Sequence, residues 1–451
     1  MRNWKLSGAP ALAKSAPLFC ALLCAALCPS APAENWPQWR GPLYNGSSPE
    51  KGLPSNWSKD SVLWTAALPG PAAASPVIWG DLVFVSTVDS TASSLNALCF
   101  DRLTGKVLWN KTVAKGAILE DDKSNYATPS PVADAAHCFF FYGNGIMAAF
   151  DHAGNQLWSR NILKDFQPLA FNWTFSCAPA LYGDRLFMQV LQRDVPTRGH
   201  GRTTGPNDSA LLVLDPATGA QLARVPRPTD AVAESRESYT TPIPLEFQGR
   251  TTIMVCGGNY VTGHDPLTGK EVWRSPNFNP LKKDDWRMVA SPVVSDGVIL
   301  ICSPQVANPI VGIKLAGGGP QPATTIAWSD NDHTEASADV PTPVVLDGDF
   351  FVLGDRKSNL SRVEPATGKI KWTVPTPGSR KYETPPTAGD GKIYLMNQSG
   401  QVAVVNAADG AILHTIPMGD PGEQLVRSPI AISGGALFIR TNHKLYCVGA
   451  K

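Results

Sequence analysis

Short apolar runs alternate with turn residues along most of the chain. The stretches Ala74–Ser86, Cys177–Gln189 and Ala290–Cys302 share one pattern: a small residue and a proline precede an apolar run, a Gly-Asp or Asp-Gly pair follows, and a second apolar run ends the unit. A glycine-aspartate turn between two apolar runs is typical of a β-hairpin. These stretches therefore predict pairs of antiparallel strands.

The proline of this pattern marks a long internal repeat. It recurs at Pro76, Pro131, Pro179, Pro242, Pro292, Pro343, Pro385 and Pro429. Recurrence at intervals of roughly 40 to 60 residues is typical of a protein built from stacked structural units. The eight positions predict eight such units.

A second phrase completes each unit. "DRLTGKVLW" at Asp101–Trp109 returns as "DPLTGKEVW" at Asp265–Trp273 and as "EPATGKIKW" at Glu364–Trp372. The aspartate can cap its own backbone, the threonine hydroxyl can contact the backbone, and the glycine accepts the left-handed conformation that closes a hairpin. The first unit is thus expected to have a third strand at Ala97–Phe100, a turn at Asp101–Gly105 and a fourth strand at Lys106–Val113.

Four strands per unit, without a convincing helical period, predict an all-β fold. We expect an eight-bladed β-propeller of four-stranded antiparallel blades over residues 61–451. The eighth unit starts at Pro429 and ends with Lys444–Lys451, one strand short, whereas Ser61–Leu68 reads as a fourth strand before the first unit. The N-terminal strand is therefore predicted to close the last blade and remove the free edges.

Tryptophans fall at one equivalent strand position of the repeat. They are Trp64, Trp109, Trp158, Trp273, Trp328 and Trp372. The third unit has Ala223 at this position, and the fifth unit is the most degenerate, with Gly312–Gly319 in place of the usual turn. Large rings at one repeated position are expected to pack between neighbouring blades.

Residues 1–33 have the features of a secretory signal. Arg2, Lys5 and Lys14 precede an apolar run at Ala16–Cys28 that is too short to span a bilayer, and small residues at Ala31–Ala33 fit a cleavage site. Cleavage would leave residues 34–60 as an N-terminal extension and move the formal net charge from +1 to −2. A nearly neutral chain argues against nucleic acid as the partner. We expect a periplasmic or secreted protein without a transmembrane segment; the alternative is a retained membrane anchor.

Six cysteines remain in the mature chain. They are Cys99, Cys138, Cys177, Cys256, Cys302 and Cys447. All lie in or beside apolar runs of strand type, without a CxxC motif, so we expect buried thiols, with disulfide pairing in an exported protein as the alternative. The cysteines and the seven histidines form no cluster with metal-ligand spacing.

The repeat A-x-x-x-D-x-x-T-G-K-x-x-W resembles the tryptophan-docking repeat of pyrroloquinoline-quinone (PQQ) propellers, over about residues 61 to 451. "NWPQWRGP" at Asn35–Pro42 is similar to the N-terminal signature of exported bacterial PQQ-like proteins. The resemblance extends to quinoprotein dehydrogenases and to the assembly lipoprotein of the Bam complex, which binds no cofactor. Quinoprotein alcohol dehydrogenases would add a vicinal Cys-Cys pair and a calcium site, and no matching positions occur here.

The mouth of the central channel is the usual ligand site of a propeller. Loops that join the outermost strand of one blade to the innermost strand of the next meet there. The candidate ligand-binding residues in these loops are Asn125, Tyr126, Asn172, Trp173, Glu237, Tyr239, Trp286, Arg287, Tyr382, Glu383 and Arg427. Aromatic, acidic and arginine side chains around one funnel suit a planar or sugar-like ligand, although the same side chains can simply fill the funnel and tie the blades together.

Two insertions interrupt the repeat. Gln192–Asp208 is basic and Ser329–Asp339 is acidic. Either can cover the channel, meet a partner or be a solvated loop. His200 and His333 lie in them as lone histidines, which is weak evidence for catalysis.

These observations favour a non-catalytic binding or scaffold protein of the cell envelope that uses the channel mouth and the loops. We expect a monomer that binds an envelope protein or a small molecule, with no cofactor. The alternative is an enzyme with its site at the funnel, either a PQQ-dependent oxidoreductase with calcium or an enzyme that acts on another small ligand.

Overall fold

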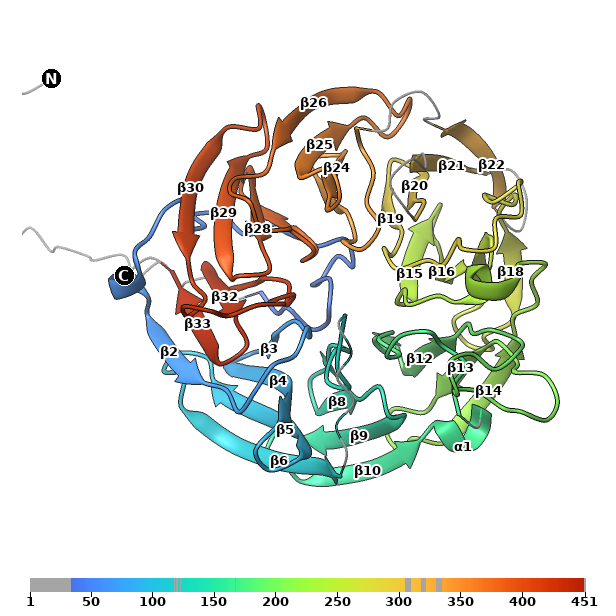
Figure 1. Cartoon of the computed structure of the whole chain (residues 1–451), viewed down its shortest axis with the longest axis horizontal. Coiled ribbons are helices and arrows are strands. Elements are labelled where there is room, and N and C mark those ends of the chain that lie inside the picture. The colour runs from blue at the N-terminus through green and yellow to red at the C-terminus, as the bar shows by residue number, and fades with distance from the viewer. Residues whose placement is uncertain are drawn as a thin grey trace, which may run out of the picture. The chain divides into compact units, whose positions relative to one another are not determined.

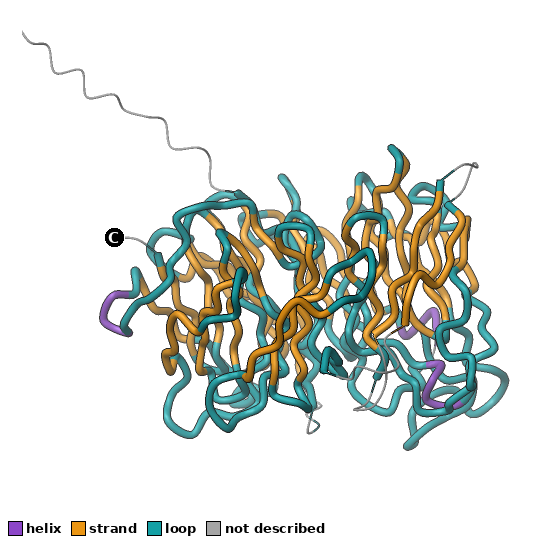
Figure 2. Tube along the Cα trace, turned by 90° about the horizontal axis from the view of Figure 1, so that it is seen from above, coloured by secondary structure: helices purple, strands orange, loops and turns teal. Residues whose placement is uncertain are grey.

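The computed structural model describes residues 34–449, except 117, 119, 120, 122, 167, 305–309, 318–321 and 330–334. Within these residues, eight sheets of antiparallel propeller strands surround one axis (Figure 1). The strands run between two loop-lined faces of the ring (Figure 2). The predicted eight-bladed propeller is thus confirmed, whereas the predicted signal segment lies outside the described residues.

The blades are numbered in chain order, with strands given from the innermost to the outermost. Blade 1 consists of β3 (Val77–Trp79), β4 (Leu82–Asp89), β5 (Ser94–Asp101) and β6 (Val107–Lys115), and blade 2 of β7 (Val132–Ala133), β8 (His137–Phe141), β9 (Ile146–Asp151) and β10 (Gln156–Asn161). Blade 3 consists of β11 (Ala180–Tyr182), β12 (Arg185–Val190), β13 (Ala210–Leu214) and β14 (Gln221–Pro226), and blade 4 of β15 (Ile243–Phe247), β16 (Arg250–Gly257), β17 (Tyr260–His264) and β18 (Glu271–Arg274).

Blades 5 to 8 follow the same order. Blade 5 consists of β19 (Val293–Ser295), β20 (Val298–Cys302), β21 (Ile310–Ala316) and β22 (Ala323–Ser329), and blade 6 of β23 (Val344–Leu346), β24 (Asp349–Gly354), β25 (Asn359–Val363) and β26 (Ile370–Pro375). Blade 7 consists of β27 (Thr387–Gly389), β28 (Lys392–Met396), β29 (Gln401–Asn406) and β30 (Ile412–Pro417), and blade 8 of β31 (Ala431–Ser433), β32 (Ala436–Arg440), β33 (Lys444–Val448) and β2 (Trp64–Ala67).

Helical structure in the described residues is limited to three short segments. They are the 3-10 helices η1 (Lys59–Ser61) and η2 (Ala233–Arg236) and the helix α1 (Leu163–Phe166). No helix in this part of the chain has the length and apolar character needed to cross a membrane.

The repeated turn forms as the sequence predicts. Asp101 Oδ1 accepts hydrogen bonds from the Leu103 and Thr104 amides, at 3.1 and 2.8 Å, and from the Thr104 hydroxyl at 2.7 Å. Gly105 has a φ of +70° and donates its amide to the Asp101 carbonyl. These bonds, the Thr104 hydroxyl above all, hold the pKa of Asp101 below its ordinary value. The aspartate therefore organises the turn as an ionised acceptor.

The repeated tryptophans join consecutive blades. Five of the six donate their indole N–H to a backbone carbonyl in the turn of the next blade: Trp64 to Arg102, Trp109 to His152, Trp158 to Pro216, Trp328 to Pro365 and Trp372 to Ala408, at 2.8 to 3.1 Å. The glycine of the same turn faces the ring. A Cβ on Gly105 would lie 2.5 Å from Trp64. The turn glycine is thus required both by its left-handed backbone and by the docked indole.

Trp273 departs from this arrangement. Its indole donates to the Thr252 hydroxyl of its own blade, at 3.2 Å. The sequence of blade 5 lacks the D-x-x-T-G turn that receives the indole elsewhere. Trp273 is nevertheless buried among side chains of blades 4 and 5, so it fills the space between blades without the hydrogen bond.

The N-terminal strand closes the ring as predicted. Strand β2 pairs antiparallel with β33, with Trp64 opposite Cys447 and Ala67 opposite Lys444. In Figure 1 the blue β2 lies beside the red β33. Blade 8 is therefore assembled from both ends of the propeller, which leaves no blade with a missing outer strand.

The extension before β2 crosses the channel at the face opposite to the candidate site. We call residues 34–57 the strap. Within it, β1 (Ser47–Ser48) pairs parallel with β27, and Trp36 forms a β-bridge with Ile78 of blade 1. The buried Arg40 donates to the carbonyls of Pro343 and Pro386, at 2.7 and 2.9 Å. The strap thus ties blades 1, 6 and 7 together, a role that the sequence did not reveal.

Hydroxyl groups join four pairs of neighbouring blades at the other mouth. The residue before the repeat proline accepts a backbone N–H from the preceding blade: Ser130 from Ser75, Thr241 from Ala178, Ser291 from Thr241 and Thr342 from Ser291, at 2.9 to 3.2 Å. These bonds fix the innermost strands at the position where the connecting loops converge. At these positions the wall of the candidate site is therefore backbone that hydroxyl side chains of the next blade hold in place.

Candidate functional site

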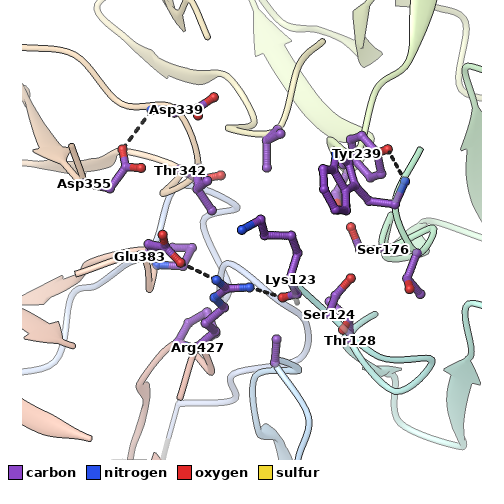
Figure 3. Close-up of a pocket in the computed structure, with 18 of the residues that line it drawn as sticks. Lys123, Ser124, Thr128, Ser176, Tyr239, Asp339, Thr342, Asp355, Glu383 and Arg427 are labelled. Carbon is purple, nitrogen blue, oxygen red and sulfur yellow. Dashed lines mark hydrogen bonds and ion pairs between the residues drawn. The ribbon is translucent and has the colours of Figure 1, made fainter. Parts of the chain in front are cut away.

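The loops that enter the innermost strands enclose a pocket of about 340 Å³ (Figure 3). Its lining comes from several blades: Ala73, Lys123, Ser124, Thr128, Ser130, Trp173, Thr174, Ser176, Ala178, Tyr239, Thr241, Arg287, Val289, Asp339, Val340, Thr342, Asp355, Arg356, Lys381, Glu383, Pro385, Arg427 and Pro429. We call this pocket the funnel. The strap adds Trp39 from the opposite side, so the channel is narrowed below the funnel.

Five of the eleven predicted residues line the funnel. They are Trp173, Tyr239, Arg287, Glu383 and Arg427. The other six, Asn125, Tyr126, Asn172, Glu237, Trp286 and Tyr382, are not part of its lining and hold loops instead. Tyr382, for example, is 2% exposed and donates to the Pro377 carbonyl at 3.0 Å. Ligand binding by these six residues stays a prediction, and their position outside the lining does not favour it.

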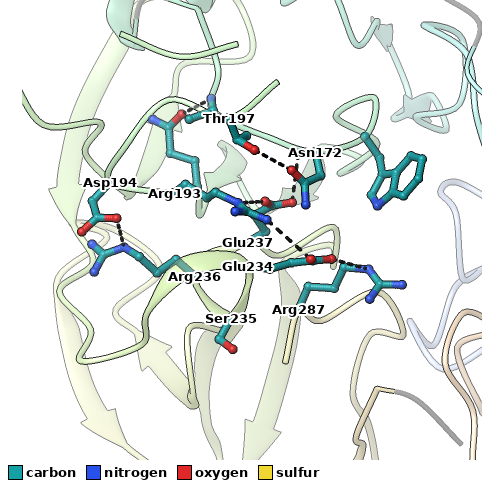
Figure 4. Close-up of polar contacts among 12 residues, drawn as sticks. Asn172, Arg193, Asp194, Thr197, Glu234, Ser235, Arg236, Glu237 and Arg287 are labelled. Carbon is teal, nitrogen blue, oxygen red and sulfur yellow. Dashed lines mark hydrogen bonds and ion pairs between the residues drawn. The ribbon is translucent and has the colours of Figure 1, made fainter. Parts of the chain in front are cut away.

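Glu237 anchors the funnel wall from behind (Figure 4). This carboxylate is fully buried, pairs with the Arg193 guanidinium, and accepts the Tyr239 hydroxyl at 2.6 Å and the Asn172 amide at 3.1 Å. The Tyr239 hydroxyl in turn accepts the Trp173 amide at 3.2 Å. A buried carboxylate that accepts from three donors holds those donors firmly in place. Glu237 therefore fixes the position of Tyr239 directly and that of Trp173 through the Tyr239 hydroxyl.

The basic insertion lies at the rim of this network. Arg193 starts it, Thr197 donates its hydroxyl to Asn172 Oδ1 at 2.6 Å, and the Arg198 guanidinium lies 4.7 Å from the centre of the Trp173 ring. His200 is exposed in the same loop. The insertion therefore stands over one edge of the funnel. Residues 330–334 of the acidic insertion, which include His333, fall outside the described residues.

Three carboxylates and five cations line the funnel. Asp339 pairs with Arg356 at 2.5 Å and with Arg287 at 3.7 Å, and Glu383 pairs with Arg427 at 2.5 Å. Arg427 also donates to the Lys123 carbonyl, and the Lys123 side chain extends toward the middle of the pocket (Figure 3). The lining thus has more cationic than anionic groups, and most of them are held by ion pairs.

Asp355 is a buried titratable group in the funnel wall. It is 4% exposed, and its Oδ1 accepts the Asp339 backbone amide at 2.9 Å. Burial, together with the negative charges of Asp339 and Glu383, raises the pKa of Asp355 to about 6. The charge of the pocket therefore changes near pH 6.

The aromatic part of the funnel is Trp173 with Tyr239. Trp173 is half-buried, and the Lys123 ammonium lies 5.8 Å from its ring centre. Tyr239 is buried, which raises the pKa of its phenol well above its ordinary value and keeps it a neutral hydrogen-bond donor. An indole with cations on its face can contact a ring and an anionic group of one ligand.

Sequence reasoning missed Trp39, Lys123, Asp339, Asp355, Arg356 and Lys381 in the lining. Asp355 and Arg356 follow the second strand of blade 6. In an antiparallel blade, the loop after the second strand opens at the same mouth as the loop before the first strand. Inspection of both loop sets, rather than one, would have found this pair. Trp39 carries no such signal because the path of the strap does not follow from the repeat.

A quinoprotein alcohol dehydrogenase would hold its quinone with a calcium site and a vicinal cysteine pair. Among the described residues, no three His, Cys, Asp or Glu side chains converge as metal ligands. The six cysteines in this part of the chain are unpaired and buried in the blades.

A family model covers almost all of the propeller. The model described as outer membrane protein assembly factor BamB matches residues 54–172, 99–374 and 321–450. The chain belongs to the BamB family. No curated protein sequence matches it.

Solved structures with the same fold include BamB and quinoproteins. BamB from Moraxella catarrhalis is 14% identical, with a TM-score of 0.58 over 86% of this chain and 97% of that chain. A europium-containing methanol dehydrogenase is 11% identical, with a TM-score of 0.60 over 91% and 90% of the two chains. Quinohemoprotein alcohol dehydrogenase from Comamonas testosteroni is 12% identical, with a TM-score of 0.61 over 94% and 82%. At these identities the likeness establishes the propeller fold shared by BamB proteins and quinoproteins, and no more.

Proposed function

We propose that this BamB-family propeller is a non-catalytic binding protein of the cell envelope, exported to the periplasm or beyond, and that its funnel holds a small ligand. The signal-like sequence of residues 1–33 and the family support the location. The observation that carries the binding role is the convergence of Trp173, Tyr239 and charged side chains on one pocket of about 340 Å³.

The geometry suits a planar or sugar-like ligand with polar substituents. Trp173 offers a half-buried ring to stack on, and the Lys123 and Arg427 side chains add positive charge that favours an anionic or polar group of the ligand. Asp339 and Glu383 are engaged with arginines, which keeps the wall in place before the ligand arrives. A pocket that is already ordered loses little conformational entropy on binding.

The first experiment is calorimetric titration of the chain Glu34–Lys451 with PQQ, with and without calcium, followed by neutral sugars, sugar acids and aromatic acids. We expect saturable binding of at least one ring-containing ligand, and at least tenfold weaker binding by Trp173→Ala. Trp79→Ala is the matched control, because Trp79 ends β3 at the opposite face. Absence of binding across the series would contradict the proposal.

The same titration separates the alternatives. Calcium-dependent binding of PQQ would favour the oxidoreductase and call for dye-linked dehydrogenase assays. Binding of no small molecule would favour a scaffold for an envelope protein, which the family match supports. In that case a photo-crosslinking residue in place of the exposed Arg198 should capture a partner, whereas one in place of Lys314 on β21 should not.

A further inference from the structure

Arg440 is a buried cation at the seam where the two ends of the propeller meet. It ends β32 in blade 8, is fully buried, and donates Nη1 to the Ser86 carbonyl of blade 1 at 2.6 Å. Its Nε and Nη2 are also buried, and no acceptor within the described residues receives them. The Tyr142 hydroxyl, from the end of β8 in blade 2, is likewise buried without a partner in this part of the chain.

The other buried arginines show how this fold normally accommodates a guanidinium. Arg227 donates Nε to the Thr262 hydroxyl and Nη2 to the carbonyls of Gly257 and Tyr260, at 2.9 to 3.1 Å. Arg40 donates to three backbone carbonyls. Within the described residues, backbone carbonyls receive both terminal nitrogens of these two side chains, although Nε of Arg40 has no acceptor. Arg440 has one carbonyl, for Nη1, and its Nη2 has none. Buried donors without acceptors are rare in native proteins and call for an explanation.

Among the described residues, no carboxylate pairs with Arg440. Burial lowers its pKa to about 9, so the side chain remains a cation at neutral pH, and Tyr142 is the ionisable group that acts on it. Burial raises the pKa of Tyr142 well above its ordinary value, so the phenol is neutral. A buried cation without a counter-charge is costly unless an anion accompanies it.

We propose that Arg440 and Tyr142 bind a small inorganic anion, of which chloride is the representative. The Arg440 Nε and Nη2 groups and the Tyr142 hydroxyl are all buried and able to donate. The two side chains come from blades 8 and 2 and are close enough for each to act on the pKa of the other. A water molecule would accept hydrogen bonds from these donors but would not neutralise the positive charge of Arg440. An anion would do both. The Ser86 hydroxyl donates to the carbonyls of Ala127 and Pro129 instead, at 3.3 and 3.4 Å.

This anion would act as a structural ligand of the closed ring. It would link blades 8, 1 and 2, next to the blade that is completed by β2. The site is separate from the funnel lining, and it does not depend on the funnel ligand. An anion that binds the folded protein and not the unfolded chain raises the unfolding temperature as its concentration rises.

The test is thermal unfolding of the mature chain in sodium chloride against sodium gluconate at constant ionic strength. We expect the unfolding temperature to rise with chloride in the wild type, the rise to vanish in Arg440→Met, and to shrink in Tyr142→Phe. Arg227→Met is the matched control: it removes a buried arginine that backbone oxygens already satisfy, so its chloride response should equal that of the wild type.

Crystals soaked in sodium bromide provide a second measurement that needs no variant. Anomalous scattering should place a bromide within hydrogen-bond distance of Arg440 and Tyr142. The proposal is overturned if the wild type shows no chloride response, if Arg440→Met keeps the full response, or if a water and no bromide occupies the position. If Arg440→Met does not fold, Tyr142→Phe and the bromide experiment decide.

Discussion

The indole N–H of Trp109 in blade 1 donates to the His152 carbonyl of blade 2 at 3.0 Å, and the Trp109 ring packs on Gly154 of the same turn. The bond joins a side chain of one repeat to the backbone of the next. The same contact recurs at four other junctions, so blades 1, 2 and 6 are held in this way by a neighbour on both sides. Blade stability is therefore expected to be shared along the ring.

Trp109→Ala should lower the free energy of unfolding by about 3–5 kcal/mol, since it removes a large buried ring and leaves the His152 carbonyl without its donor. Urea unfolding of the mature chain measures this. Leu108→Ala is the control, because Leu108 precedes Trp109 on β6 and is 47% exposed; it should change stability by no more than about 0.5 kcal/mol. Full stability of Trp109→Ala would show that the ring is not part of the interblade core.

Arg40→Met should detach the strap. The substitution keeps the volume of the side chain but leaves the Pro343 and Pro386 carbonyls without donors, so we expect a loss of about 3 kcal/mol and faster proteolysis within residues 34–57. Limited proteolysis followed by mass spectrometry locates the cut. Lys51→Ala, at an exposed position of the strap, should leave the rate of cleavage unchanged.

Asp355→Asn should flatten the pH dependence of stability. The native pKa of Asp355 is raised to about 6, whereas an unfolded aspartate titrates near about 4. Between these values the folded protein binds more protons than the unfolded chain, so its stability falls as the pH rises, by up to about 3 kcal/mol. The asparagine keeps an acceptor for the Asp339 amide without the charge.

Urea unfolding at pH 4.5, 6 and 7.5 compares the two proteins. The variant should be the more stable one at pH 7.5 and should differ least at pH 4.5. Asp60→Asn, at an exposed position, should keep the wild-type pH profile. An identical pH profile for Asp355→Asn and the wild type would mean that Asp355 does not titrate near pH 6.

The six cysteines should be unreactive in the folded protein. All are buried, and burial raises the pKa of Cys99, Cys256 and Cys447 to about 12. A thiol-specific chromogenic reagent should therefore detect no thiols in the native mature chain and six after denaturation without reductant. Fewer than six after denaturation would reveal disulfide pairing, the alternative that the sequence left open.

The fold was readable from the sequence because its information is local and repeated. Proline, glycine and tryptophan mark the same strand ends in most units, and Trp64 before the first unit revealed how the ring closes. The site was harder to predict because it is assembled from loops that follow no repeat. Arg287 and Glu383 were found by their place before a repeat proline, whereas Trp39 and Lys123 depend on the paths of the strap and of an irregular connection.

The pairing of β2 with β33 also sets the order in which the molecule can be completed. Residues 64–67 are among the first propeller residues to be synthesised, and residues 444–448 are among the last. Blade 8 cannot form until nearly the whole chain exists, so a growing chain holds an unsatisfied strand at its beginning throughout synthesis. A circular permutation that starts the chain at Pro69 and moves β2 to its end would let every blade form in sequence order.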